Sequence, residues 1–217
     1  LDLHTGRTNA IWAFILGLAS LNILCFIYSG FVITFRRTRT KIKNKIKAKD
    51  AEIVLLVGSE NGTTLFFANQ IHRQLLNEGK RSYLAEMNQF QSFESAKEMV
   101  IFTSTYGLGD PPSNANQFEN LLQKFPQQNK IGYSVVGFGS KSYQEFCAFA
   151  VKVNDLLANQ NWAEPTTSIF TINDRSADEF ATWAHVWSEK TLHPHATAPA
   201  VYNTKIPGLN KFNKKKK

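Results

Sequence analysis

The chain has 217 residues, of which 43% are apolar, with two cysteines and a formal net charge of +8. This length fits one ordinary globular domain with appendages and is too short for a complete reductase that carries several cofactors. Two cysteines exclude a disulfide framework, and five scattered histidines make a dedicated metal site unexpected. Because the first residue is Leu1 and not Met, we expect the chain to be a piece of a longer protein.

The positive charge lies in two segments that flank an acidic one. Residues 36–50 carry eight Lys/Arg and one Asp, and residues 205–217 carry six Lys and no acid. Residues 51–190 instead carry ten Lys/Arg and fifteen Asp/Glu. Nucleic-acid binding favours a basic surface on the fold itself, and Phe212 is the one aromatic residue among the C-terminal lysines. We therefore expect no nucleic-acid partner.

Residues 10–35 contain no charged side chain and predict a transmembrane helix. A helix of this length rises about 39 Å, enough to cross a bilayer with some tilt. A buried core helix seldom runs so far without a polar face, and a signal peptide carries its positive charge before the apolar run. Here the charge follows, so the positive-inside rule predicts a periplasmic end at 1–9 and a cytoplasmic side after the helix, in the inner membrane.

Residues 36–50 predict a basic juxtamembrane linker. The interpretation we favour is contact with anionic lipid headgroups, which also fixes the topology. The alternative is an electrostatic seat for the acidic domain that follows.

From residue 51 the chain alternates strands and helices as far as residue 190. Short apolar runs predict strands at 52–58, 81–87, 98–104, 133–139 and 167–172. Helical spacing predicts helices at 65–80, 113–125, 143–159 and 176–190. Five strands alternating with helices predict an α/β fold with a doubly wound parallel sheet.

Helix-end signals accompany these predicted helices. Gly79 predicts the end of the first helix, and Ser113 or Asn114 an N-cap for the second. Ser176 followed by Glu179 predicts a capping box for the last.

Ligands of such sheets bind beyond the carboxyl ends of the strands, which directs attention to the loops 58–64, 105–113 and 138–143. The first, GSENGTT, leads into a helix whose N-terminal N–H groups and dipole attract a phosphate. It lacks the Lys of a P-loop and the spacing of a Rossmann GxGxxG motif, so it suits a monophosphate that is held and not transferred. We expect Glu60 to point to solvent. The alternative is an ordinary turn with a Thr-rich cap.

The other two loops each carry a tyrosine beside glycines. Tyr106 precedes Gly107-Leu108-Gly109, and Tyr143 ends the segment that begins at Gly137. Two tyrosines at neighbouring strand ends can sandwich a flat heterocycle by offset stacking. Each tyrosine taken alone is more often a half-buried packing residue.

The motifs GSENGTT, STYGLGDPPSNANQF and VVGFGSKSYQEFC closely resemble the flavodoxin-like FMN domain of diflavin reductases, a family that includes cytochrome P450 reductases and the sulfite reductase flavoprotein. The resemblance covers roughly 52–190 and implies a flavodoxin-like fold and bound FMN. It places Gly107 at the glycine that contacts N5 of the flavin, and Tyr106 and Tyr143 at the stacking positions. The cofactor-binding residues expected from the loops and the resemblance are Ser59, Glu60, Asn61, Gly62, Thr63, Thr64, Thr105, Tyr106, Gly107, Gly109, Asp110, Gly139, Tyr143 and Asp174.

The resemblance also implies an acidic rim for docking electron partners, formed by Asp174, Asp178 and Glu179. Two positions depart from the family pattern: Leu108 stands where many relatives have Glu, and Ser140 where Asp or Asn is usual. These departures bear on redox potential and partner choice more than on FMN binding. No general base or nucleophile is expected, so we interpret Cys147 as a packed thiol in the helix that follows the third loop.

Residues 1–35 resemble the last span of PepSY-associated membrane proteins, in which His4 would be a haem ligand or a solvated periplasmic side chain. The Pro/Lys-rich segment 191–217 is interpreted as a linker to an FAD and NAD(P)H domain that is missing here. The sequence thus predicts a membrane-tethered FMN electron-transfer domain of an NAD(P)H-dependent reductase, with a haem or iron acceptor. The alternative is a flavodoxin-like membrane module that has lost its cofactor.

Overall fold

The structure, a computed structural model, describes residues 9–39, 42 and 44–191. The expectations for His4 and for residues 192–217 therefore lie outside the described residues. The chain divides into two compact units, one ending at Lys43 and one beginning at Asn44. We call the second the α/β unit.

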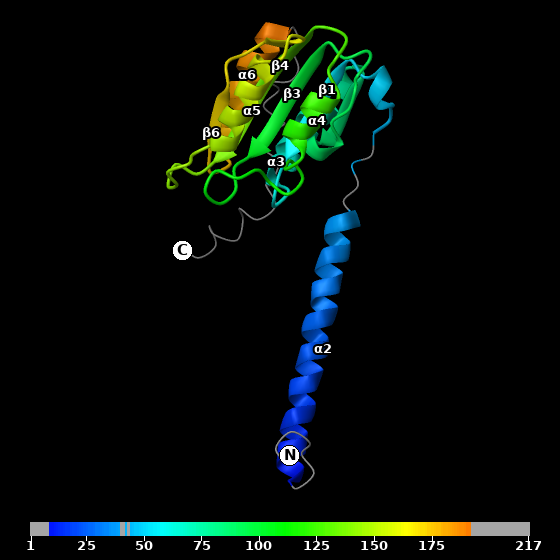
Figure 1. Cartoon of the computed structure of the whole chain (residues 1–217), viewed down its shortest axis with the longest axis vertical. Coiled ribbons are helices and arrows are strands. Elements are labelled where there is room, and N and C mark those ends of the chain that lie inside the picture. The colour runs from blue at the N-terminus through cyan, green and yellow to red at the C-terminus, as the bar shows by residue number, and fades with distance from the viewer. Residues whose placement is uncertain (1–8, 40–41, 43, 192–217) are drawn as a thin grey trace. The chain divides into compact units, whose positions relative to one another are not determined.

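The first unit is the helix α2, Ala10–Arg39 (Figure 1). Asn9 begins it, because its side-chain oxygen accepts hydrogen bonds from the backbone N–H groups of Ile11 at 2.9 Å and Trp12 at 3.4 Å. The stretch Ala10–Ile33 has a mean hydropathy of 2.3 and is not buried against any described part of the chain. By length and composition this helix can cross a membrane.

The α/β unit is built on a parallel sheet, as the sequence predicted. Its strands are β1 (Ile53–Gly58), β2 (Ser82–Glu86), β3 (Glu98–Ser104), β4 (Ile131–Gly139), β5 (Ala163–Pro165) and β6 (Phe170–Asn173). The order across the sheet is β2-β1-β3-β4-β5, with β6 also paired to β4. Five strand positions are therefore present, and the order reverses direction beside β1, as in a doubly wound sheet.

The fifth position is divided between two short strands, where one strand was predicted at 167–172. β5 pairs with the start of β4, from Ile131↔Ala163, and β6 with its end, from Val136↔Phe170. The first piece ends at Pro165, and the N–H of the next residue, Thr166, still donates to the Tyr133 carbonyl of β4 at 2.8 Å. The break is bridged by side chains, since the Thr167 hydroxyl donates to Ser134 Oγ at 3.0 Å.

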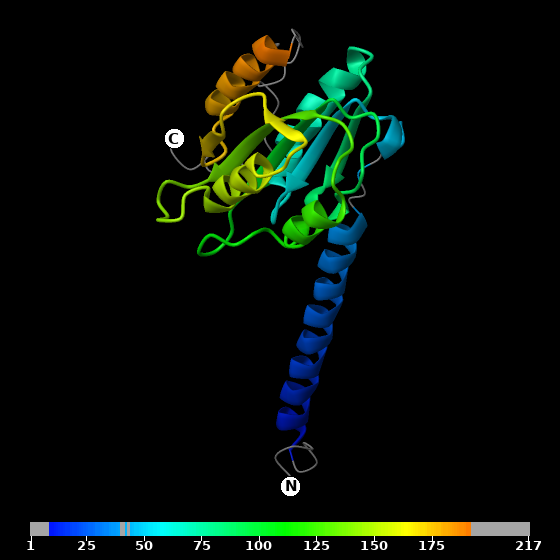
Figure 2. The ribbon, with the colours of Figure 1, turned by 45° about the horizontal axis from the view of Figure 1, so that its top comes forward.

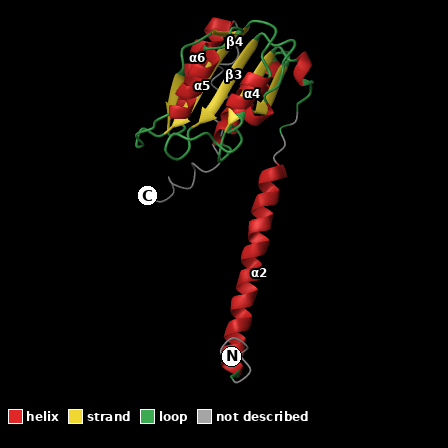
Figure 3. Cartoon of the chain, in the orientation of Figure 1, coloured by secondary structure: helices red, strands yellow, loops and turns green. Residues whose placement is uncertain are grey.

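Helices cover both faces of the sheet (Figures 2 and 3). The helices are α3 (Thr63–Asn77), α4 (Phe118–Lys124), α5 (Ala148–Ala158) and α6 (Ala177–Thr191), with short 3-10 turns at Ala48–Asp50 and Met87–Gln89. α4 and α5 lie on one face, and α3 and α6 on the other. Alternate residues of each strand point to opposite faces of the sheet and pack against the helices there. Val54 packs in the cluster that contains Phe149 of α5, while Phe102 packs on Trp183 of α6 at a ring-centroid distance of 5.2 Å.

Two helices begin later than predicted. The prediction of a helix over 113–125 capped by Ser113 or Asn114 is wrong, because α4 starts at Phe118 and its N-cap position is Gln117. The prediction of a helix over 143–159 is wrong at its start, because Cys147 adopts a left-handed φ of 55° immediately before α5. Gly79 has the left-handed φ of 74° typical of a helix end, and its N–H donates to the carbonyl of Leu76 at 3.1 Å.

Candidate functional site

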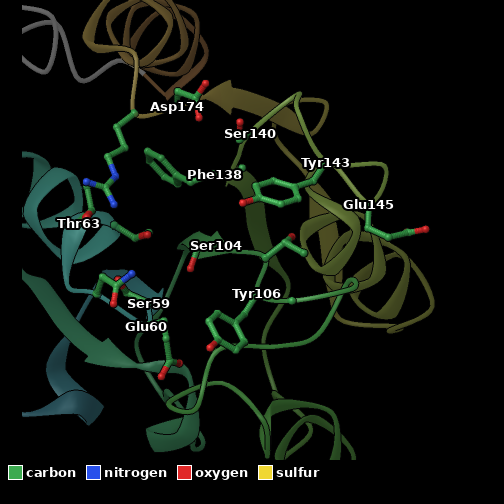
Figure 4. Close-up of a pocket in the computed structure, with 16 residues that line it drawn as sticks. Ser59, Glu60, Thr63, Ser104, Tyr106, Phe138, Ser140, Tyr143, Glu145 and Asp174 are labelled. Atoms are coloured by element: carbon green, nitrogen blue, oxygen red, sulfur yellow. The ribbon is translucent and has the colours of Figure 1, made fainter.

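A cavity of about 540 Å³ opens beyond the carboxyl ends of β1, β3, β4 and β6 (Figure 4). This volume falls within the roughly 300–1,000 Å³ of small-molecule sites. All three loops singled out from the sequence contribute to its wall. Figure 4 shows Ser59 and Thr63 on one side of the hollow and Tyr143 on the other.

The first loop leaves β1 through a position that only glycine can occupy. A Cβ on Gly58 would lie 2.4 Å from the hydroxyl oxygen of Thr103, well inside contact distance. After Gly62, at a φ of 74°, α3 begins with no side-chain cap among the described residues. The first N–H groups of a 15-residue helix are thus left for a ligand, at the positive end of its dipole.

Glu60 does not point to solvent, as the sequence had led us to expect. One carboxylate oxygen accepts a hydrogen bond from the backbone N–H of Ser113 at 2.8 Å, and the other from its hydroxyl at 3.4 Å. Beside it, Asn114 Oδ1 accepts from the backbone N–H of Ser59 at 2.8 Å. Ser113 and Asn114 therefore hold the first loop where a helix cap had been predicted.

The second loop is a tight turn closed at its base. Tyr106 N–H donates to the Asp110 carbonyl at 2.9 Å, and Asp110 N–H donates to the Tyr106 backbone carbonyl at 2.8 Å. The turn requires positive φ at Gly107, which is 54°, and at Gly109, which is 106°. It leaves Leu108 91% exposed and Tyr106 57% exposed. A stackable ring and an aliphatic side chain are thus held at the surface by backbone bonds.

The third loop places Tyr143 at the cavity with 70% of its surface exposed. Its N–H donates to the Ser140 carbonyl at 3.0 Å, which holds the turn that carries the ring. Cys147 behind this loop is fully buried, as expected of a packed thiol. Burial raises the pKa of its thiol to about 11, so it stays protonated and unreactive near neutral pH.

A fourth loop, between β6 and α6, also reaches the cavity. Asp174 and Arg175 adopt left-handed φ values of 44° and 66°. Only half of the predicted capping box forms here: Ser176 Oγ accepts from Glu179 N–H at 3.2 Å, but the Glu179 carboxylate accepts from the backbone N–H of Asn173 at 2.6 Å. That bond fixes the end of β6 next to the left-handed pair.

The structure brings most of the predicted site residues to one cavity. Eleven of them line it: Ser59, Glu60, Asn61, Thr63, Thr64, Thr105, Tyr106, Gly107, Gly139, Tyr143 and Asp174. Three do not, namely Gly62, Gly109 and Asp110, which shape the loops instead. The predicted rim residues Asp178 and Glu179 lie in the first turn of α6 and do not line it either.

Five lining residues were missed: Ser104, Phe138, Ser140, Glu145 and Arg175. Four of these lie within the loops 105–113 and 138–143 or within two residues of them. Arg175 follows Asp174 directly, and its basic side chain in an acidic segment was the signal that could have identified it.

The match to known proteins covers the α/β unit. Residues 55–187 match the family model described as Flavodoxin. The chain is 32% identical over 125 residues to an inducible nitric oxide synthase of Carassius auratus, covering 56% of this chain and 75% of that protein. It is 32% identical to the sulfite reductase [NADPH] flavoprotein alpha-component of Buchnera aphidicola and 30% identical to the NADPH–cytochrome P450 reductase of Rattus norvegicus. Those alignments cover 48% and 52% of this chain but only 19% and 18% of the relatives, so the chain spans a small part of their length.

Solved structures give the same fold. Oxidised Flavodoxin 2 from Bacillus cereus superposes with a TM-score of 0.56 at 22% identity, over 64% of this chain and 99% of that one. A flavodoxin of Streptococcus pneumonia gives 0.55 at 22% identity, over 65% and 98%. At these identities the likeness shows the fold alone.

Proposed function

Because the chain belongs to the flavodoxin family, we propose that its α/β unit binds FMN and transfers electrons as part of an NAD(P)H-dependent reductase. The observation that carries this proposal is the cavity wall, which combines an uncapped helix N-terminus with two exposed tyrosines. These are the two features that a flavin mononucleotide needs, a seat for a phosphate and stacking surfaces for a ring.

The residues present fit this cofactor. The α3 N-terminus, with Ser59, Thr63 and Thr64, would hold the phosphate through N–H and hydroxyl donors. Tyr106 and Tyr143 would bind the isoalloxazine ring, and their exposed faces are free to stack on it. The positive φ of Gly107 lets the peptide at the turn approach the ring without a Cβ in the way.

FMN, when bound, supplies transfer of electrons one or two at a time. The role of the protein is to bind and orient the flavin ring, to set the charge around it and to leave one edge of the ring accessible. The carboxylates of Glu145 and Asp174 on the cavity wall disfavour added negative charge, because like charges raise each other's free energy. We therefore infer that this site holds the flavin potential low.

The acceptor surface that we propose surrounds the exposed Leu108. Its side chain is 91% exposed beside Tyr106 at the mouth of the cavity. The proposed partners are a reductase domain that binds FAD and NAD(P)H, and a haem or iron acceptor. Names of relatives support this inference, since sulfite reductase and cytochrome P450 reductase are both described as NADPH enzymes.

We further propose that α2 anchors the domain in the inner membrane, with the α/β unit on the cytoplasmic side. The support is the apolar length of Ala10–Ile33 and the Lys/Arg that follow it. Extraction of membranes with alkaline carbonate should leave the chain in the pellet. Release into the supernatant would contradict the anchor.

Cofactor extraction tests the central proposal. The purified chain should be yellow, and acid-released cofactor should elute as FMN in a ratio near one per chain. Stoichiometric FAD would contradict the single phosphate seat. A colourless preparation that also fails to take up added FMN would instead support the cofactor-free module.

A further inference from the structure

The cavity wall contains one positive charge. Among the described residues that line it, Arg175 is the only Lys or Arg, whereas Glu60, Glu145 and Asp174 are acidic. No carboxylate of a described residue forms an ion pair with its guanidinium, and the side chain is exposed. The guanidinium of Arg175 thus lies at the cavity without an ion-pair partner among the described residues.

Packing beneath the cavity brings Arg175 close to the first loop. Phe67, four residues after Thr63, and Phe180, five residues after Arg175, pack with ring centroids 4.6 Å apart. Since each phenylalanine lies about one turn inside its helix, this contact places the N-terminal ends of α3 and α6 side by side. In Figure 4, Thr63 and Asp174 lie along the same side of the hollow, with Phe138 between them.

The backbone that carries Arg175 is held in place. Left-handed φ values at two successive non-glycine residues are energetically unfavourable, so the surrounding bonds must impose them. Asp174 N–H donates to the Gly139 carbonyl at 2.8 Å, and Ser176 N–H donates to that of Asn173 at 2.9 Å. These two bonds hold the backbone on both sides of Arg175 at the edge of the cavity.

We propose that Arg175 binds the phosphate of the flavin at the α3 N-terminus and makes the site select a phosphorylated flavin over the unphosphorylated one. This rests on the proposed FMN function. The loop 58–64 contains no Lys or Arg, so neutral donors alone would face a dianion there. A guanidinium offers two parallel N–H donors to phosphate oxygens, in a site where water is partly excluded.

Titration of the 217-residue chain, freed of flavin and kept in detergent, tests the proposal with FMN and riboflavin as separate probes. Arg175→Gln should weaken FMN binding by about tenfold, within the range of a lost charge-assisted hydrogen bond, and leave riboflavin binding within about twofold. Arg175→Lys should restore part of the FMN affinity, because it keeps the charge but loses the bidentate geometry. The salt dependence of FMN affinity should be smaller in Arg175→Gln than in the wild type.

Lys141→Gln is the matched control. It removes one positive charge from the neighbouring loop, but its ammonium lies over the ring of Phe146, 5.8 Å from the centroid, and it does not line the cavity. Its ratio of FMN to riboflavin affinity should equal that of the wild type.

Each outcome is decisive because the ratio of the two affinities is measured on the same variant, whatever its stability. An unchanged ratio in Arg175→Gln overturns the proposal, and so does an equal loss for both probes, which would indicate contact with the ring or the loop. If the wild type binds FMN and riboflavin equally, phosphate selection fails while flavin binding stands. If the wild type binds neither, the proposed function itself fails.

Discussion

The side-chain oxygen of Asn114 lies 2.8 Å from the backbone nitrogen of Ser59 and accepts its hydrogen bond. Asn114 belongs to the loop after β3 and Ser59 to the loop after β1. A second hydrogen bond, from Ser113 N–H to the Glu60 carboxylate, joins the same two loops. The loop 58–64, which we propose holds the phosphate, is therefore braced by the loop that also carries Tyr106. We therefore expect flavin binding at one loop to depend on the integrity of the other.

Asn114→Ala should weaken FMN binding by about tenfold. It leaves the Ser59 N–H without its acceptor, a cost of about 1–3 kcal/mol where the group is shielded from water, and each 1.4 kcal/mol corresponds to a decade in affinity. Flavin fluorescence titration measures the dissociation constant. Asn161→Ala, an exposed asparagine that follows α5 at the other end of the sheet, should leave it unchanged. Equal constants for the wild type and Asn114→Ala would show that the brace does not shape the site.

Tyr143→Ala should lower FMN affinity by about tenfold or more. Stacking contributes about 0.5–1.5 kcal/mol beyond the area that the ring buries, and removal of the ring also exposes one flavin face to water. Tyr143→Phe should lose far less, because the ring carries the contact. Since Tyr143 is 70% exposed, the Ala variant should leave the flavin-free melting temperature nearly unchanged. A lowered melting point with an unchanged dissociation constant would instead assign this tyrosine to packing.

The sheet and most of the cavity wall follow from the sequence because they depend on local patterns. Buried parallel strands appear as continuous apolar runs such as Ile53–Gly58, and the carboxyl ends of such strands converge on one edge. The two tyrosines beside glycines could be placed at that edge from the sequence, because each follows the carboxyl end of a predicted strand. The predicted edges of these elements were reliable where a strand was buried on both faces.

What the sequence could not reveal depends on contacts between distant segments. Ser113 and Asn114 have the composition of a helix cap, but their hydrogen-bonding groups serve Glu60 and Ser59 across the site, and α4 starts later in consequence. The Glu179 carboxylate likewise accepts a hydrogen bond from the Asn173 N–H and not from the N–H of its cap residue, Ser176. Side-chain choices between equivalent hydrogen-bond partners are decided by tertiary structure, and local spacing cannot distinguish them.

Acidification should destabilise the α/β unit through His72. This side chain is 5% exposed, and its Nδ1 lies 2.9 Å from the Ser82 hydroxyl oxygen. Burial, and to a smaller degree the charge of Arg73, lowers the pKa of His72 below its usual 6.5. The unfolded state therefore binds the proton first, and stability is lost as the pH falls from about 6.5 toward the lowered value, by about 1.36 kcal/mol per pH unit.

His72→Gln should flatten this pH dependence, because the substituted side chain does not titrate. Urea unfolding followed by tryptophan fluorescence at a series of pH values between neutral and mildly acidic measures the effect. His185→Gln is the control, since that histidine side chain is 63% exposed and pairs with Glu189 on the same helix, at 3.3 Å. The prediction is wrong if both variants keep the slope of the wild type.

Asn44→Ala should destabilise the α/β unit from outside the sheet. The Asn44 amide donates to the Leu84 carbonyl at 2.8 Å and accepts from the Leu84 N–H at 2.9 Å, so one side chain pairs with both backbone groups on the edge strand β2. At about 0.5–1.5 kcal/mol per net hydrogen bond, the loss should reach about 1–2 kcal/mol, and the melting temperature should fall by about 2–8 °C. Asn44→Asp keeps the acceptor but cannot donate to the Leu84 carbonyl, so the free energy of unfolding should fall by at least the contribution of that one hydrogen bond. Lys45→Ala, which alters an exposed neighbour, should change the melting temperature little. If Asn44→Ala and Lys45→Ala melt together at the wild-type temperature, the segment after α2 does not hold the edge of the sheet, and residue 44 is an ordinary part of the linker.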